Sequence, residues 1–353
     1  MRIEIELTGK CNLACVMCPQ VFGYDGRHLT IDEMKSFSSL FIEAKEVTLH
    51  GAGEIFLSPI LKETLDIIPE DTPIYFLTNG QLLNQKNSNI ILGRSNIKRI
   101  MVSLDAYSDE KYKFIRGGNV NKVKENLKHF ILLRKKRKLS FPKIVINATV
   151  FKYNIDQLLA LAKFAKELDS ELHVWPLLKD AAHYTESWKV KRGEYTFDYT
   201  KETFDSIEDK QLLKREYLLL EKYCKDNEVD LIFDAFMNLP DKAEDISTCG
   251  VPNSNRLFFS DGQAKHCCLQ TKPLFDWRIY PANNFDNHPR HLAVLELMKK
   301  NQIPIECSSS GCKYVLDGIS SEFIDDRKKI SLDDRGFRGG ALSMRRRKNE
   351  LKN

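Results

Sequence analysis

The first 180 residues alternate strand-like and helix-like segments, and this alternation restricts the fold more than any other feature of the sequence. Short apolar runs recur between stretches whose apolar residues follow helical spacing. Thr30 with Glu33 forms the pattern of a capping box at the start of one expected helix. The expected strands cover residues 3–7, 46–51, 74–80, 97–105, 143–151 and 171–177, and the expected helices cover residues 29–41, 58–68, 120–137 and 155–168.

Repeated strand–helix steps with short connections predict a parallel sheet with helices on its outer side. Six steps are too few for the usual eight-stranded barrel, so the expected fold class is α/β, a partial (β/α)6 TIM barrel. Functional groups in such barrels lie at the C-terminal ends of the strands. Residues 11–18, 51–54, 78–80 and 103–105 all follow expected strands, which predicts one shared site.

Composition limits the class of protein. The 353 residues are 42% hydrophobic and 29% charged, as in ordinary globular proteins. The sequence shows no secretory signal and no apolar run near the roughly 20 residues of a membrane span, so a cytoplasmic protein without membrane contact is expected. The net charge of +5 is concentrated partly in residues 134–138 and 345–348. These runs lack interleaved aromatic residues, which favours solvated surface over nucleic-acid binding.

Three of the nine cysteines follow the first expected strand with the spacing C-x3-C-x2-C: Cys11, Cys15 and Cys18. A reducing cytoplasm disfavours disulfides. Thiolates are soft ligands that suit iron–sulfur clusters. Three of them can hold three irons of a [4Fe–4S] cube and leave the fourth iron open to a chelating ligand. A zinc loop completed by His28 is the alternative.

This cysteine loop resembles that of the radical SAM superfamily, and the resemblance extends from residue 1 to about 178. It implies that the open iron binds the amino and carboxylate groups of S-adenosylmethionine. Reduction then cleaves this cosubstrate to a 5′-deoxyadenosyl radical, which takes a hydrogen atom from the substrate. The resemblance also implies an electron donor such as flavodoxin or ferredoxin.

The same resemblance implies a set of cosubstrate-binding residues. HGAGE (50–54) is similar to the family's G-G-E stretch, which meets the methionine amino group, and VSLDA (102–106) is similar to a segment that reaches the ribose. The alternative for HGAGE is a simple strand-to-helix turn. The alternative for Ser103 and Asp105 is that they are polar groups whose hydrogen bonds are satisfied at the strand end. The residues implied are Met17, where the family often has an aromatic residue, and Gly51, Ala52, Gly53, Glu54, Asn79, Ser103, Asp105, Arg116 and Asn147.

A second set of cysteines lies in the C-terminal third. Residues 256–268 predict a β-hairpin around the turn dipeptide Asp261-Gly262. Cysteines on both sides of this hairpin, followed by CSSSGC (307–312), resemble the C-terminal extension of SPASM and Twitch radical SAM enzymes. The number of cysteines suits one auxiliary [4Fe–4S] cluster, with a zinc site on the same thiols as the alternative. Its implied ligands are Cys249, Cys267, Cys307 and Cys312.

The expected organisation has four parts: the barrel at 1–180, a linker or substrate loop with a helix at 181–228, a Twitch/SPASM-like auxiliary-cluster domain at 229–320, and a charged tail at 321–353. Cys224, on the expected helix 212–227, is either a small buried residue or a hydrogen-atom donor to a substrate radical. Cys268 is the other candidate donor.

The resemblance implies a radical SAM oxidoreductase or epimerase with two [4Fe–4S] clusters and S-adenosylmethionine. The barrel begins at residue 2, without the leader-binding domain of many peptide-modifying relatives, so a small hydroxylated substrate is expected: a sugar, aminocyclitol or nucleotide derivative. Modification of a peptide is the alternative. A non-catalytic iron–sulfur or zinc protein is the alternative from a different class, and it would release no 5′-deoxyadenosine.

Overall fold

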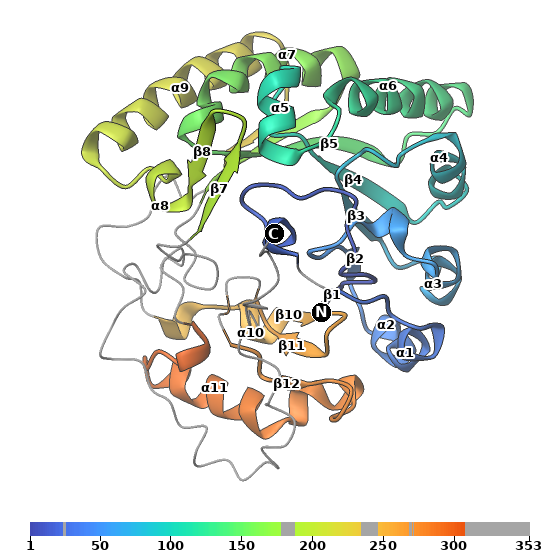
Figure 1. Ribbon diagram of the computed structural model, residues 1–353. Helices are drawn as coiled ribbons and strands as arrows, with labels where there is room; N and C mark the ends of the chain where they lie inside the picture. The colour runs from blue at the N-terminus through green and yellow to red at the C-terminus, as the bar shows by residue number, and fades with distance from the viewer. Residues whose placement is uncertain (24–25, 178–187, 234–245, 268–269, 271, 308–353) are drawn as a thin grey trace, which may run out of the picture.

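The computed structural model describes residues 1–23, 26–177, 188–233, 246–267, 270 and 272–307. Its main element is a 10-stranded sheet with the strand order β12-β11-β10-β1-β2-β3-β4-β5-β6-β9 (Figure 1). Strands β1 to β6 run parallel and follow the chain order. These strands are β1 (Arg2–Ile5), β2 (Glu46–Leu49), β3 (Ile74–Thr78), β4 (Ile97–Ser103), β5 (Lys143–Val150) and β6 (Glu171–Pro176).

Helices follow these strands and cover the outer side of the sheet (Figure 1). They bury alternate strand residues such as Ile144, Ile146 and Ala148 in the apolar core. The predicted partial barrel is confirmed. The capping box of Thr30 and Glu33 is also confirmed. The helices are α1 (Ile31–Ser36), α2 (Ser38–Ile42), α3 (Leu61–Ile67), α4 (Gln85–Leu92), α5 (Asp109–Arg116), α6 (Val120–Lys136) and α7 (Leu158–Leu168), with short 3-10 helices η1 (Pro19–Phe22), η2 (Ile55–Leu57) and η3 (Lys152–Gln157).

The C-terminal part continues the barrel sheet instead of forming a separate one. Strand β10 (Asn255–Phe258) pairs in parallel with β1, and β11 (Gln263–Lys265) returns antiparallel as the predicted hairpin. Its remaining elements are β12 (Phe275–Asp276), α10 (Val251–Ser254), α11 (Pro289–Lys299), and the 3-10 helices η5 (Ile246–Thr248), η6 (Ala282–Asn287) and η7 (Ile305–Cys307).

Residues 231–233, which fall in the region expected to be the auxiliary-cluster domain at 229–320, form a strand of the barrel sheet. Strand β9 (Leu231–Phe233) pairs in parallel with β6, at the opposite edge of the sheet from β10–β12. Helix α9 (Ile207–Asp226) leads into it and packs beside α7 (Figure 1). Strand β9 is close in sequence to the cysteine-rich segment. Its pairing with β6 depends instead on the sheet edge that the preceding helix α9 reaches.

The segment expected to be an irregular linker contains ordered structure after residue 187. Strands β7 (Lys189–Arg192) and β8 (Tyr195–Asp198) form an antiparallel hairpin, and α8 (Tyr199–Glu202) follows. Trp188, Phe197 and Tyr199 are buried, whereas Lys189, Lys191 and Glu194 are exposed. Charged residues dominate this short stretch, so the sequence pattern conceals its strands. None of the described helices is long and apolar enough to cross a membrane.

Candidate functional site

The loop with the three cysteines lies at the C-terminal end of β1, on the inner side of the barrel (Figure 1). Cys15 is buried, and Cys11 and Cys18 are half-buried. Hydrogen-bond donors face two of the sulfurs. The Leu13 amide lies 3.4 Å from Cys11 Sγ, and Arg116 Nη1 lies 3.8 Å from Cys15 Sγ. Donors directed at sulfur stabilise thiolates, which are the form that binds iron.

Burial raises the pKa of all three thiols, and that of Cys18 reaches about 12. Buried thiols of this kind lose their protons when a cation binds them. Among the described residues, no three His, Cys, Asp or Glu side chains converge on the position of a single metal ion. A [4Fe–4S] cluster requires no such convergence, because each thiolate holds a different iron. Soft thiolate donors suit such a cluster, and a zinc site stays the alternative.

The HGAGE loop after β2 packs directly against the start of the cysteine loop. A β-carbon on Gly53 would lie 2.1 Å from the Thr8 carbonyl oxygen and 2.6 Å from that of Lys10. The Glu54 amide donates to the same Lys10 oxygen over 2.8 Å. Gln20 bonds both the Gly9 and the Ala52 carbonyls, so it joins the two loops from the other side. The sequence predicts that these loops are neighbours, and the structure brings them into contact.

Glu54 is almost fully buried, and its carboxylate is occupied by protein donors. It accepts from Thr78 Oγ1 over 2.6 Å and from the Asn79 amide over 2.7 Å. Asn79 in turn donates to Asn12 Oδ1 over 2.8 Å and lies 3.9 Å from Cys11 Sγ. Glu54 thus joins the ends of β2 and β3 beneath the cysteine loop. Its contact with a methionine amino group stays a prediction.

Asp105 and Arg116 form a buried ion pair behind Cys15. Asp105 is fully buried, and its Oδ2 lies 2.7 Å from Arg116 Nε. The other oxygen of Asp105 accepts from the Thr149 amide over 2.8 Å. Both oxygens of Asp105 therefore accept hydrogen bonds from the protein itself. This is the alternative to a ribose contact that the sequence left open. This arrangement places Asp105 against Arg116 and, through it, Cys15, and the ribose contact stays a prediction for both Ser103 and Asp105.

The sequence analysis missed two residues of the β7–β8 hairpin region that hold the cysteine loop. Trp188 Nε1 donates to the Val16 carbonyl over 2.8 Å, and Trp188 is 1% exposed. The Arg192 guanidinium donates to the carbonyls of Ala14 and Phe114. These carbonyls lie within or next to the cysteine loop, so the hairpin fixes the loop backbone. Only the presence of Trp and Arg in a polar segment pointed to such a role.

Half-buried polar side chains of β4 and β5 lie side by side near the strand ends. Ser103 is paired in register with Asn147, and Asn147 with His173 on β6. Trp175 is 38% exposed, and its Nε1 donates to Asn147 Oδ1 over 2.7 Å. Their neighbours along each strand are buried against the helices, so these side chains occupy the opposite face of the sheet. Trp175 was not among the predicted residues. Met17 packs partly buried against the core.

Three segments with cysteines of the second set pack on α11. Ile246 in η5, before Cys249, donates to Asn301 Oδ1 over 3.1 Å, two residues after the end of α11, and η5 contacts the helix itself. His266, before Cys267, lies 2.6 Å from His291 through their ring nitrogens. Glu306, before Cys307, forms a buried ion pair with Arg290 of α11. Helix α11, absent from the sequence expectations, is their common scaffold. Cys268 and Cys312 lie outside the described residues.

Cys224 is a residue of α9, and its side chain is 2% exposed and part of the apolar core. Burial raises the pKa of its thiol to about 11. The helix belongs to the outer layer of the barrel (Figure 1). This position is that of a packing residue, as the first of the two sequence interpretations describes.

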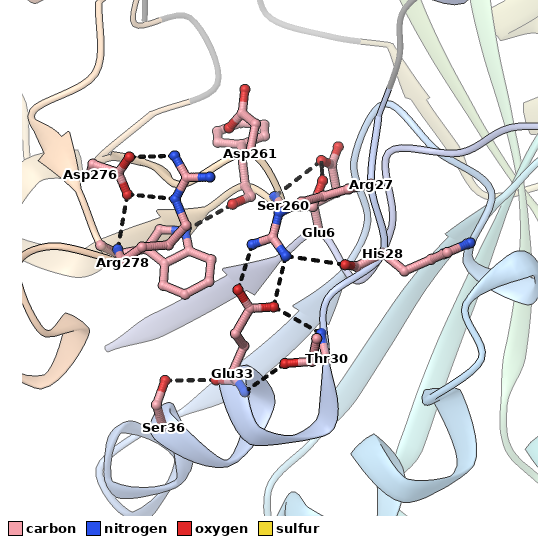
Figure 2. A network of polar contacts seen from close by, with 12 residues as sticks. Glu6, Arg27, His28, Thr30, Glu33, Ser36, Ser260, Asp261, Asp276 and Arg278 are labelled. Atoms are coloured by element: carbon pink, nitrogen blue, oxygen red, sulfur yellow. Dashed lines mark hydrogen bonds and ion pairs between the residues drawn. The ribbon is translucent and has the colours of Figure 1, made fainter. Parts of the chain in front are cut away.

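A cavity of about 540 Å³ lies between α1 and the segment after β12, away from the cysteine loop. Its charged lining residues are already paired: Glu33 with Arg27, and Arg278 with Asp276 (Figure 2). None of its lining residues is a predicted site residue, and we assign it no function.

We expect Gly53→Ala to disrupt the cysteine loop. The new β-carbon meets backbone oxygens of Thr8 and Lys10, which have no rotamer with which to move away, so the segment entering Cys11 must shift. Such overpacking costs about 1–3 kcal/mol of unfolding free energy. Chemical denaturation and iron bound per chain after reconstitution measure the effect. Gly93→Ala is the control, because Gly93 has φ −83° and the closest atom to its added β-carbon lies at 3.3 Å. Equal iron in both variants would contradict the prediction.

Comparisons with known proteins agree with this geometry. The profile of the radical SAM superfamily matches residues 5–165. The GTP 3′,8-cyclase of Listeria monocytogenes is 28% identical over 199 residues, which is 54% of this chain and 57% of that protein. The GTP 3′,8-cyclase of Clostridium perfringens is 30% identical over 188 residues, covering 50% and 55%. The chain spans little more than half the length of these curated relatives.

Solved structures resemble a larger part of the chain. The crystal structure of Streptococcus suis SuiB bound to S-adenosylmethionine has a TM-score of 0.62 at 17% identity and covers 84% of this chain and 68% of SuiB. Native anSMEcpe with bound AdoMet has a TM-score of 0.61 at 15% identity and covers 91% and 92%. These likenesses extend beyond the barrel and confirm the expected fold.

Proposed function

We propose that this chain, whose residues 5–165 match the radical SAM superfamily, cleaves S-adenosylmethionine and abstracts a hydrogen atom from a small hydroxylated substrate. The observation that supports the chemistry is the loop of Cys11, Cys15 and Cys18, with donors facing its sulfurs. When bound and reduced, a [4Fe–4S] cluster supplies the electron that converts the cosubstrate to a 5′-deoxyadenosyl radical.

The residues of the chain would hold and orient these groups. Cys11, Cys15 and Cys18 are the cluster ligands in this proposal. The backbone of the HGAGE loop lies against Lys10, next to Cys11, and is placed to meet the methionine end of the cosubstrate. Ser103 and Asn147 offer hydrogen bonds on the inner face of the sheet. The Asp105–Arg116 pair keeps a positive charge beside Cys15.

Polar groups on the inner face of the barrel support a hydroxylated substrate. Trp175 offers an aromatic surface held by Asn147, and Glu171 lies 3.4 Å from His173 and 3.3 Å from Arg99. The likeness to GTP 3′,8-cyclases adds support for a nucleotide derivative within this class. A peptide is the second candidate. The structures of SuiB bound to the precursor peptide SuiA and of anSMEcpe bound to the Cp18Cys peptide resemble this chain at 17% and 16% identity, so the likeness extends to the fold alone. The buried position of Cys224 favours oxidation over epimerisation through that thiol.

We further propose that Cys249, Cys267, Cys307 and Cys312 hold an auxiliary [4Fe–4S] cluster. The packing of three of their segments on α11 supports this assignment. A second cluster would accept the electron that a two-electron oxidation of the substrate releases. A zinc ion on the same thiols is the alternative.

Iron content and S-adenosylmethionine cleavage test the proposal together. The reconstituted protein should bind about eight irons per chain, because each [4Fe–4S] cluster contributes four. After reduction with dithionite it should release 5′-deoxyadenosine from S-adenosylmethionine. Cys267→Ala should retain about four irons and still bind S-adenosylmethionine.

Each part of the proposal has its own contrary result. Absence of 5′-deoxyadenosine from the iron-loaded, reduced protein would overturn the enzymatic function. About four irons in the unaltered chain, with no further loss in Cys267→Ala, would overturn the auxiliary cluster alone. One zinc per chain in place of the second set of irons would establish the alternative.

A further inference from the structure

Glu6 is a buried acidic residue directly after β1, and the reaction as proposed above assigns it no role. It is 2% exposed, and three hydrogen bonds end on its carboxylate. Oε2 accepts from the Ala52 amide over 2.6 Å. Oε1 accepts from Ser260 Oγ over 2.6 Å and from the Ser260 amide over 3.2 Å. Figure 2 shows Glu6 directed at Ser260. One side chain therefore joins three segments that are far apart in the sequence.

On one side, the carboxylate determines where the HGAGE loop lies. A β-carbon on Gly51 would come within 2.2 Å of Glu6 Oε2 and 2.3 Å of its Cγ. Only glycine allows this approach, and it brings the next amide, that of Ala52, onto the carboxylate. The loop is held elsewhere by Lys10 and by Gln20. Glu6 connects the loop to the C-terminal region through Ser260.

On the other side, the carboxylate fixes the tip of the β10–β11 hairpin. Ser260 is fully buried and uses both its amide and its hydroxyl on Glu6. It immediately precedes the Asp261-Gly262 turn, and the hairpin then continues to Cys267. The Trp277 indole holds the preceding Phe259 carbonyl over 2.8 Å. The hairpin tip is thus a fixed point against which the HGAGE loop is set.

We propose that Glu6 is a positioning residue that fixes the HGAGE loop against the β10–β11 hairpin, so that cosubstrate binding depends on the C-terminal region. This inference rests on the proposed function, because it takes the HGAGE loop to bind S-adenosylmethionine. The geometry requires an acceptor on both sides of the side chain. A carboxylate accepts at both oxygens, whereas an amide offers one oxygen and one NH2 group.

Glu6→Gln keeps the volume of the side chain but replaces one of the two acceptor oxygens with an NH2 donor. Its NH2 group must face either the Ala52 amide or the Ser260 amide, which are themselves donors. Hydrogen bonds to a charged acceptor are about twice as strong as neutral ones, so the loop loses its strongest tie to the hairpin. We expect the dissociation constant for S-adenosylmethionine to rise about tenfold, the loss that corresponds to one such bond.

The experiment compares four variants of the reconstituted full chain by equilibrium dialysis with S-adenosylmethionine in the absence of reductant. Glu46→Gln is the control, because Glu46 lies at the start of the neighbouring strand β2 and pairs with Arg2 but with neither Ala52 nor Ser260. Ser260→Ala removes the hydroxyl donor and leaves the amide. The double variant of Glu6→Gln and Ser260→Ala completes a cycle that measures coupling. Iron per chain and thermal unfolding are recorded for each variant.

The proposal expects weaker S-adenosylmethionine binding in Glu6→Gln at unchanged iron, and unchanged binding in Glu46→Gln, whatever change each variant shows in melting temperature. Ser260→Ala should weaken binding to a smaller degree, and the double variant should match Glu6→Gln. Unchanged binding in Glu6→Gln, or additive effects in the double variant, would overturn it. A wild-type chain that binds no S-adenosylmethionine would overturn the proposed function, and this inference with it.

Discussion

Cys15→Ala should abolish 5′-deoxyadenosine production and remove the iron of the first site. Cys15 is the middle and most buried thiol of the three, and Arg116 and the Asp105 pair are built around it. Alanine leaves the cluster two ligands from this loop, too few to hold three irons. We expect activity to fall below detection, a loss of more than about 10³-fold, because removal of the reacting group removes the chemical step. High-performance liquid chromatography of the reduced reaction mixture measures it.

Cys224→Ala provides the matched control for this variant. Cys224 is also a buried cysteine, but it belongs to α9 and packs in the apolar core. It should retain the full iron content and release 5′-deoxyadenosine at the wild-type rate. Unchanged iron and cleavage in Cys15→Ala would refute the assignment of the first cluster. Loss of cleavage in Cys224→Ala would refute the packing role given to that residue.

Asp105→Asn produces the largest expected loss of stability. The substitution keeps the shape of the side chain but leaves the Arg116 guanidinium buried without its countercharge. Breaking a buried ion pair by removing one partner costs about 3–5 kcal/mol. The freed guanidinium also lies against Cys15 Sγ, so the cysteine loop should become disordered together with α5. Urea unfolding of the iron-free protein measures the stability, and hydrogen exchange of residues 11–18 measures the loop.

An exposed ion pair supplies the comparison. Lys128 and Glu167 lie 2.6 Å apart with about half of each side chain exposed, so Glu167→Gln should change stability little. The interpretation of Asp105 as a positioning residue fails if Asp105→Asn unfolds at the same urea concentration as Glu167→Gln. It also fails if exchange in residues 11–18 is unchanged.

The sequence alone was sufficient for the barrel and for the first cysteine set. Apolar periodicity and short connections identify β1 to β6 because parallel strands and amphipathic helices are defined by local patterns. Cys11, Cys15 and Cys18 are close in sequence, so their spacing alone places all three on one loop after β1. The Asp261-Gly262 turn likewise indicates its hairpin through local backbone preferences.

Only the tertiary structure decided the contacts between distant segments. The pairing of β9 with β6 and of β10 with β1 depends on which sheet edges the connecting chain reaches, and no local pattern encodes that. The buried roles of Asp105 and Glu6 could not be assigned from sequence, because a carboxylate at a strand end looks the same whether it meets a ligand or an arginine. The identity of the residues determined which chemistry is available. Long-range packing determined which carboxylates, such as Asp105 and Glu6, form hydrogen bonds within the protein.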